Sequence, residues 1–356
     1  MNQMPQMITR RRTLWIMGGL AGGLALHACT QQPQTSSDAT SASADAPAES
    51  IAATTASTLW IGYTPFYIAL EKGFFQESGL NLDYKVMSTT GEIDAAFASG
   101  RLDGQNNVTS EAVALAAKGQ DFRVVMVADT SNGGDGILAR NSVADIADFR
   151  GKSVAVEVGG VSHFFLLQVL EEAGLTADDV EITNLSPDAA AAAYQAGRAD
   201  IAVTYSPFLK QANDAQPDGR IIYDTTQMPT AIVDLYIFNP EFVQANPAGM
   251  QAFVDGVLKG IEFIETNPDE AYEIAGRRLE LSPEDVATEL QGVKLTTLED
   301  NIQMLSNPES EVYLLGHMDA LGQFLKDQNQ IPQPPSEATI SQLLEPTFVK
   351  AAQEKA

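Results

Sequence analysis

The sequence predicts an α/β protein of two lobes, each a sheet flanked by helices, with two crossover segments that form a hinge. Three observations lead to this fold class: short apolar strands alternate with helical stretches, one segment of the first half recurs in the second, and a further strand follows the second set of elements. Alternating strands and helices are typical of layered α/β domains. With 356 residues, 44% of them apolar, the chain is long enough to form two hydrophobic cores.

The first lobe is expected to begin near residue 58. Short runs of apolar residues between polar turns are typical of strands, and longer runs with helical periodicity are typical of helices. The predicted strands of the first lobe are 59–62, 81–86, 102–106 and 122–128, and its predicted helices are 65–75, 92–98 and 110–117. The second lobe repeats this order, with strands at 153–156, 180–183 and 201–204 and helices at 162–173, 187–196 and 207–212.

An internal repeat supports the two-lobe organisation. Residues 95–103 (AAFASGRLD) and 192–200 (AAYQAGRAD) share five identities and a Phe/Tyr pair. Each copy predicts a helix that ends at a glycine and leads into a strand. Both strands run into a hydroxyl residue, Thr109 in the first copy and Ser206 in the second, that is expected to cap the next helix.

A strand at 235–238 follows the second lobe and precedes a mostly helical region. If this strand returns to the first lobe, the chain crosses between the lobes twice, and two crossovers form a hinge. The ligand would then lie between the lobes, at the carboxyl ends of the strands. The predicted domains are 58–134 plus 235–330 for lobe 1, 135–234 for lobe 2, and 331–356 for a C-terminal tail that either covers lobe 1 or extends into solvent.

The first 28 residues are predicted to be a signal peptide. Three arginines at 10–12 precede an apolar run at 15–28 that is too short to span a bilayer. These arginines are compatible with twin-arginine export and with general secretion. The run ends in Leu-His-Ala-Cys, which resembles a bacterial lipobox, so Cys29 is expected to carry a lipid anchor. Residues 29–57 are rich in Gln, Ser, Thr, Ala and Pro and predict a flexible linker.

The composition excludes several function classes. The chain has 47 acidic and 21 basic side chains, for a net charge of −26. Such a surface repels phosphate backbones, so no nucleic-acid partner is expected. A single cysteine excludes an internal disulfide and a thiolate-rich metal site. Acidic and histidine residues lack metal-ligand spacing, and no nucleophile–base pair is evident, so we expect neither a cofactor nor catalysis.

One candidate site in the predicted cleft favours an anion. The loop after the strand at 153–156 contains Gly160 and opens a helix with Ser162 and His163. Glycines let a ligand approach the backbone, and the free N–H groups of a helix N-terminus favour negative charge. The alternative is an ordinary helix start that Ser162 caps.

A second candidate site favours a cation. Asp135, Glu157 and Asp234 fall on loops that should face the cleft, and these loops contain no Lys or Arg. Buried carboxylates require a cationic or many-donor partner. Tyrosines at 63, 67 and 205 are expected nearby, and aromatic faces attract a desolvated cation. The alternative is that these acids are solvated or cap the hinge.

Short segments of the chain occur in an order found in one protein family. They are 61–63 (IGY), 69–75 (ALEKGFF), 100–104 (GRLDG), 148–156 (DFRGKSVAV), 197–203 (GRADIAV) and 267–271 (NPDEA). In this order they resemble the periplasmic solute-binding proteins of ABC importers, in the NMT1/THI5-like group of nitrate, taurine, aliphatic-sulfonate and pyrimidine-precursor binders. The resemblance implies a type II periplasmic binding protein fold, one small ligand, an ABC permease with its ATPase as partners, a monomer, and a lipid-anchored location in the periplasm or at the cell surface.

A narrower resemblance concerns the ligand. Residues 131–135 (SNGGD), Glu157, 161–163 (VSH) and 205–207 (YSP) resemble a guanidine-binding branch and also a branch labelled as taurine or sulfonate binding. In many relatives an acid stands where this chain has Ser206, which removes one partner for a cation.

The resemblance therefore implies a guanidine-like cation or a taurine-like zwitterion. Aliphatic sulfonates, nitrate and pyrimidine precursors are alternatives, and so is a sensor that signals to a membrane receptor. The predicted ligand-binding residues are Tyr63, Tyr67, Thr109, Asp135, Glu157, Gly160, Ser162, His163, Tyr205 and Asp234.

Overall fold

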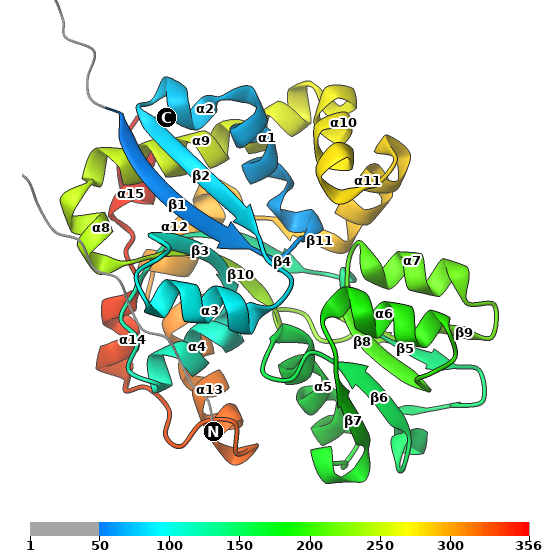
Figure 1. The fold of residues 1–356 in the computed structure, drawn as a ribbon. Helices are drawn as coiled ribbons and strands as arrows, with labels where there is room; N and C mark the ends of the chain where they lie inside the picture. Colours follow the sequence, from blue (N-terminus) through cyan, green and yellow to red (C-terminus); the bar gives the residue numbers. More distant parts are fainter. Residues whose placement is uncertain (1–49, 356) are drawn as a thin grey trace, which may run out of the picture. The chain divides into compact units, whose positions relative to one another are not determined.

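A computed structural model describes residues 50–355 of the chain (Figure 1). The predictions of a signal peptide at 1–28, of lipidation at Cys29 and of a linker up to residue 49 lie outside the described residues. Within residues 50–355, no helix combines the length and the apolar composition needed to cross a membrane.

The described residues form two sheets with helices packed against both (Figure 1). The six-stranded sheet has the order β11-β4-β10-β3-β1-β2, and the five-stranded sheet has the order β7-β6-β8-β5-β9. The first sheet contains β1 (Ile51–Ser57), β2 (Leu80–Val86), β3 (Gly104–Val108), β4 (Arg123–Ser131), β10 (Val233–Phe238) and β11 (Val293–Leu295). The second contains β5 (Asp135–Arg140), β6 (Ser153–Val156), β7 (Glu181–Asn184), β8 (Ile201–Tyr205) and β9 (Gly219–Asp224). We call these sheets and their helices lobe 1 and lobe 2.

Lobe 1 holds most of the helices. They are α1 (Thr64–Lys72), α2 (Phe74–Glu77), α3 (Thr90–Ala98), α4 (Thr109–Ala117), α8 (Pro240–Ala245), α9 (Pro247–Thr266), α10 (Pro268–Leu279), α11 (Pro283–Glu289), α12 (Leu298–Ser306), α13 (Leu314–Asp327), α14 (Glu337–Leu343) and α15 (Thr347–Gln353). Lobe 2 contains α5 (Val161–Glu172), α6 (Pro187–Gln195) and α7 (Phe208–Ala215). Strands alternate with helices in both lobes, which confirms the α/β fold class expected from the sequence.

The chain crosses between the lobes after β4 and again after β9. Strand β10 then inserts antiparallel between β3 and β4, where its whole length is buried. The two crossover segments are bonded to each other, because the Oγ of Ser131 lies 2.8 Å from the Oγ1 of Thr225, and the backbone N–H of Gly133 donates to the same hydroxyl. This pair of bonded segments is the hinge that the two-lobe prediction requires.

The structure corrects the predicted start of lobe 1. Residues 51–57 are not part of a linker; they form β1, which pairs in parallel with β2 over its full length. Composition was misleading here because the small residues Ala53 and Ala56 are buried in the sheet, where little space is available for larger side chains. The predicted strand at 59–62 is also wrong: residues Ile61–Tyr63 form a 3₁₀ turn that leads into α1.

The C-terminal region also differs from the expected run of helices. Strand β11 interrupts it and pairs with the end of β4. Helices α14 and α15 then place Ile340, Phe348 and Val349 in the core of lobe 1. Residues 337–353 therefore cover the first lobe, which was one of the two outcomes left open by the sequence.

Helices α1 and α9 pack at very close range around Gly260. A Cβ atom at this position would lie only 2.1 Å from the carbonyl oxygen of Pro65, so no larger residue fits without backbone movement. We predict that Gly260→Ala lowers the free energy of unfolding by about 1–3 kcal/mol, the usual result of overpacking a core. Gly316→Ala on α13 is the matched control, because no described residue beyond its own helix turn lies within 4 Å of its Cβ position. Urea unfolding of both variants measures the difference, and equal stability would contradict the close packing.

Candidate functional site

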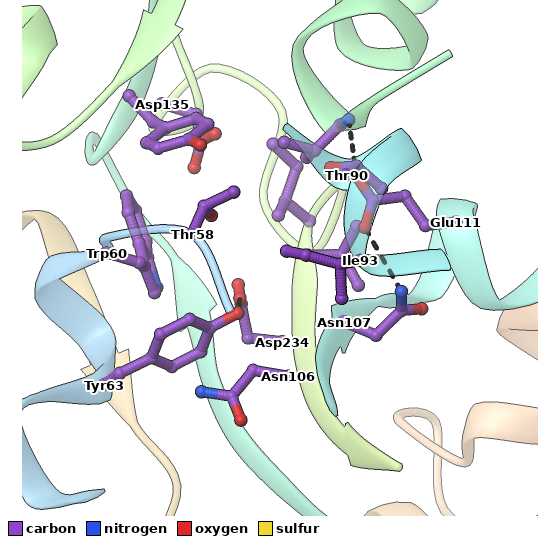
Figure 2. A pocket seen from close by; sticks show the side chains of 14 residues that line it. Thr58, Trp60, Tyr63, Thr90, Ile93, Asn106, Asn107, Glu111, Asp135 and Asp234 are labelled. Carbon is purple, nitrogen blue, oxygen red and sulfur yellow. Dashed lines mark hydrogen bonds between the residues drawn. The ribbon is translucent and has the colours of Figure 1, made fainter. Parts of the chain in front are cut away.

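A cavity of about 30 Å³ lies between the two sheets (Figure 2). Both lobes contribute to its walls. The lining residues are Thr58, Trp60, Tyr63, Thr90, Ile93, Asn106, Asn107, Val108, Glu111, Asp135, Val161, Tyr205, Ile232 and Asp234. Most of them stand at strand ends or at the first turns of helices, which are the positions where α/β sheets bind their ligands.

Three acidic side chains reach this cavity from different elements: Glu111 from α4, Asp135 from β5 and Asp234 from β10 (Figure 2). The Oδ1 of Asp234 accepts a hydrogen bond of 2.7 Å from the hydroxyl of Tyr63. Asp135 is 3% exposed, and its Oδ2 has no hydrogen-bond partner in the described chain. An unpartnered buried carboxylate oxygen is free to accept a bond from a ligand.

Burial changes the protonation of these acids. Loss of hydration raises the pKa of Asp135 from its usual 3.8 to about 7. The pKa of Asp234 is raised well above its usual value, first by burial and then by the neighbouring carboxyl group of Asp129, although the Tyr63 hydroxyl opposes this shift. Burial also raises the pKa of Glu111, and the nearby Asp94 and Glu157 add to the effect. A positively charged ligand would reverse these shifts, because it favours the ionised form of each acid.

Aromatic rings form another wall of the cavity. Trp60 and Tyr205 meet edge to face, with 5.8 Å between their ring centroids, and Tyr63 lies beside them. The Nε1–H of Trp60 donates to the carboxyl oxygens of Asp129, at 3.1 and 3.3 Å. A Cβ atom on Gly134 would lie 2.5 Å from the Trp60 ring, so this glycine is needed for the ring to stay in place.

The amides of Asn106 and Asn107 also line the cavity. The Nδ2 of Asn107 donates to Glu111 at 3.3 Å, whereas the Oδ1 of Asn107 and the Nδ2 of Asn106 have no partner among the described residues. The site therefore offers a ligand several acceptors and a smaller number of donors.

The charged side chains that line the cavity are all acidic. None of its lining residues within the described part of the chain is a Lys, Arg or His. Residues 50–355 also contain no group of three His, Cys, Asp or Glu side chains arranged to hold a metal ion. The geometry therefore suits an organic solute that brings its own positive charge or several N–H donors.

Four of the predicted ligand-binding residues line the cavity: Tyr63, Asp135, Tyr205 and Asp234. The structure brings them together from a 3₁₀ turn, two strand ends and the start of β10. Tyr67 lies deeper in lobe 1, where its hydroxyl accepts a hydrogen bond from the backbone N–H of Trp60.

The remaining predicted residues lie outside the cavity wall. Thr109 is buried as the first residue of α4, and Val108 occupies the N-cap position, so the predicted cap is wrong. Ser206 likewise is not the cap, because Pro207 precedes α7. His163 accepts from the backbone N–H of Gly159 at 3.3 Å, and burial lowers its pKa.

At the start of α5, where the sequence predicts an anion site, the first backbone N–H of the helix already bonds to a carboxyl group of the protein. Gly160 is the N-cap of this helix, and the hydroxyl of Ser162 is buried with no hydrogen-bond partner among residues 50–355. The first N–H of the helix, at Val161, donates to the Oε1 of Glu111 from lobe 1 at 2.9 Å. Glu157, also predicted to contact the ligand, accepts from the backbone N–H of Thr90 at 2.8 Å.

Sequence reasoning missed several residues of the site. Glu111 carried a usable signal, since it is the only charged residue in the buried helix TSEAVALAA. Asn106 and Asn107 are polar residues in a fully buried strand, which is a second signal. Trp60 had no comparable signal, because its position depends on the turn at Ile61–Tyr63.

Two lobes joined by paired crossovers, with a cavity between them, define the class of two-lobed binding proteins. The chain belongs to the family described as NMT1/THI5 like, whose model matches residues 60–271. This membership confirms the resemblance seen in the sequence.

The chain is also similar to individual proteins, in sequence to one and in fold to others. The chain is 27% identical over 271 residues to the taurine-binding periplasmic protein of Escherichia coli (strain K12), covering 73% of this chain and 81% of that protein. Its fold is similar to the periplasmic aliphatic sulphonate binding protein SsuA of Escherichia coli, with a TM-score of 0.67, 18% identity, and coverage of 83% and 99% of the two chains. It is also similar to the desulfurization enzyme DSZB, with a TM-score of 0.63, 16% identity, and coverage of 86% and 99%.

Trp60 provides a spectroscopic test of the site. Burial raises the pKa of Asp129 to about 8, despite the hydrogen bond from Trp60. We predict that Trp60 emission changes with a midpoint near pH 8, because Asp129 is protonated below that pH and ionised above it, where the bond becomes charge-assisted. Asp129→Asn keeps an oxygen acceptor and should abolish the transition. The second tryptophan of the sequence, Trp15, gives the same background in both proteins. A midpoint that persists in Asp129→Asn would disprove the assignment.

Proposed function

We propose that the chain is the extracytoplasmic solute-binding component of an ABC importer, and that it captures a small nitrogen-containing cation of the guanidine type between its lobes. The bound form delivers the solute to a membrane permease driven by an ATPase. In this proposal the protein acts as a monomer, and a lipid on Cys29 holds it at the outer face of a bacterial membrane.

The observation that carries the proposal is the acidic cavity. Glu111, Asp135 and Asp234 converge on it, and none of the described residues lining it is basic. Guanidinium is planar, carries its charge over several N–H donors, and binds carboxylates in pairs of parallel hydrogen bonds. The faces of Trp60, Tyr63 and Tyr205 can add about 0.5–2 kcal/mol each by cation–π attraction.

The size of the cavity points to the same class of ligand. Its volume is about 30 Å³, and a single water needs about 10–15 Å³ on the same measure. A compact planar cation fits such a space with small adjustments of the walls. Longer sulfonates would require the lobes to separate further.

Taurine is the second candidate, and the relatives favour it. Its ammonium group could bind Asp135 or Asp234, while the sulfonate would rely on hydroxyl and amide donors such as Thr58, Tyr205 and Asn106. Aliphatic sulfonates, nitrate and pyrimidine precursors are weaker candidates, because acidic walls repel an anion and no basic residue of the described lining compensates.

Binding rather than catalysis is proposed despite the structural similarity to DSZB. Fold similarity does not define chemistry, because function depends on the residues of the site. The described residues that line the cavity include no Cys, Ser, His or Lys to serve as a nucleophile or strong base. A sensor that signals to a membrane receptor is an alternative with the same ligand-binding step, and transport assays with the cognate permease separate the two.

A ligand screen tests the proposal directly. Guanidinium, urea and taurine are added to the full chain, and thermal unfolding is recorded. We expect guanidinium to stabilise the protein by about 2.7 kcal/mol at one hundred times its dissociation constant. Urea has a similar shape but no charge, so it should have no effect at these concentrations. Stabilisation by taurine alone would contradict the cation proposal and support the second candidate.

The cation proposal also predicts a pH dependence. Without ligand, Asp135 is mostly protonated below about pH 7. A cation must then displace the proton, so its affinity should fall about tenfold for each pH unit below 7. The unliganded chain should behave in the opposite way: the raised pKa means that Asp135 reduces stability as the pH rises from about 4 to 7. Calorimetric titration with guanidinium across this range measures the slope, and a flat profile would contradict the role of Asp135.

A substitution at Asp135 separates its charge from its shape. We predict that Asp135→Asn weakens guanidinium binding by about tenfold or more, because a charge-assisted hydrogen bond is lost. The unliganded variant should be at least as stable as the original chain at pH 8, since it no longer buries an uncompensated charge. Asp178→Asn is the matched control, because Asp178 is exposed in lobe 2. Equal affinities for all three proteins would exclude Asp135 from the site.

A further inference from the structure

Two helix starts are linked across the lobes, one from each. Helix α3 of lobe 1 begins at Thr90, and helix α5 of lobe 2 begins at Val161. The first backbone N–H of a helix has no partner within that helix, so it must find one elsewhere. Both of these N–H groups find a carboxyl oxygen on the opposite lobe.

The two bonds are reciprocal. Glu157, which follows β6 in lobe 2, accepts from the N–H of Thr90 in lobe 1 at 2.8 Å. Glu111, on α4 in lobe 1, accepts from the N–H of Val161 in lobe 2 at 2.9 Å. Each carboxyl group stands at the positive end of a helix dipole from the other lobe, where negative charge is favoured.

Thr90 joins the two bonds into one network. Its N–H donates to Glu157, and its Oγ1 donates to the Oε1 of Glu111 at 3.0 Å. The Oε2 of Glu111 accepts from the Nδ2 of Asn107 at 3.3 Å, which ties the network to β3. Both glutamates are almost fully buried, at 6% exposure for Glu111 and 7% for Glu157. Since Thr90, Glu111 and Val161 also line the cavity, this network closes one of its walls (Figure 2).

We propose that Glu111 and Glu157 form a reciprocal latch that holds the two lobes closed over the cavity. Separation of the lobes breaks both bonds together, because each bond has one partner on either side. In this role both acids act through the lobes. Glu157 lies outside the cavity wall and is a positioning residue, whereas Glu111 also lines the cavity. The consequence for solute release rests on the proposed function, whereas the latch itself does not.

Two opposing effects set the strength of the latch. A hydrogen bond to an ionised carboxylate is stronger than one to a neutral carboxyl group, and the raised pKa values of Glu111 and Glu157 mean that the stronger form gains population as the pH rises. Burial opposes this gain, because both carboxyl groups recover their hydration when the lobes part. Burial raises the pKa of Glu157 to about 7, which shows how large the loss of hydration is.

Amide hydrogen exchange measured by NMR on the full chain without added solute tests the latch. The N–H groups of Thr90 and Val161 are the informative ones, because their protection cannot come from their own helices. In the unchanged chain both should be protected. Glu157→Ala removes the direct partner of Thr90, and we expect exchange at Val161 to rise as well, by about tenfold or more. Glu111→Ala should raise exchange at Thr90 in the same way.

Matched variants separate the latch from a local effect. Glu92→Ala removes an exposed acid from the first turn of the same helix as Thr90 and should leave exchange at Val161 unchanged. Glu157→Gln keeps an oxygen acceptor and should restore part of the protection at both amides. Amides in the middle of α5 report whether each variant is folded.

The latch is overturned if Glu157→Ala exposes Thr90 alone and leaves Val161 protected in a folded chain. It is also overturned if both amides exchange freely in the unchanged protein. If Glu111→Ala does not fold, Glu157→Ala alone decides the question. Coupled exchange in a chain that fails to bind guanidinium would support the latch and reject the proposed function, so the two failures are distinguishable.

Discussion

The site depends on buried carboxyl groups that have no basic partner within the described part of the chain. Asp129, Asp135 and Asp234 are all 3% exposed or less, and their pKa values are raised mainly by loss of hydration. A buried ionised carboxylate is unfavourable unless a positive group or several donors compensate it. In the unliganded protein burial shifts these acids toward their protonated forms. In the proposed function, a cation that enters the cavity supplies the missing charge and so offsets part of the cost of burying these acids.

The remaining architecture keeps these acids in place. Paired crossovers bring Asp135 and Asp234 to the cavity, because the first begins β5 and the second lies at the start of β10. The core beneath them is rigid: Tyr236, Phe66 and Phe253 contact one another with centroid distances of 5.1–6.0 Å. Close packing of this kind gives a single well-defined arrangement, so the acids cannot move apart to reduce their repulsion.

The fold and part of the site could be predicted from the sequence. Asp135, Asp234 and Tyr63 stand beside strand ends or crossovers, and chain order alone places such residues near a cleft. Strand β1 escaped prediction because a sheet interior accepts small residues that composition assigns to a linker. Glu111 escaped because its partner at the start of α5 lies 50 residues away, and only closure of the lobes brings them together. The same contact explains why the helix start that favours an anion is already occupied by a carboxyl group from the protein itself.

The relatives and the cavity favour different ligands only if fold is taken to define specificity. At 27% identity the E. coli taurine-binding protein shares the framework, whereas the ligand is selected by a few side chains at strand ends and loops. A sulfonate needs donors that outweigh the repulsion of nearby carboxylates, and the described lining offers hydroxyls and amides without a cation. A guanidine-type solute needs acceptors and aromatic faces, which Glu111, Asp135, Asp234 and the surrounding rings provide. We therefore base the proposed ligand class on the electrostatics of the site rather than on shared ancestry.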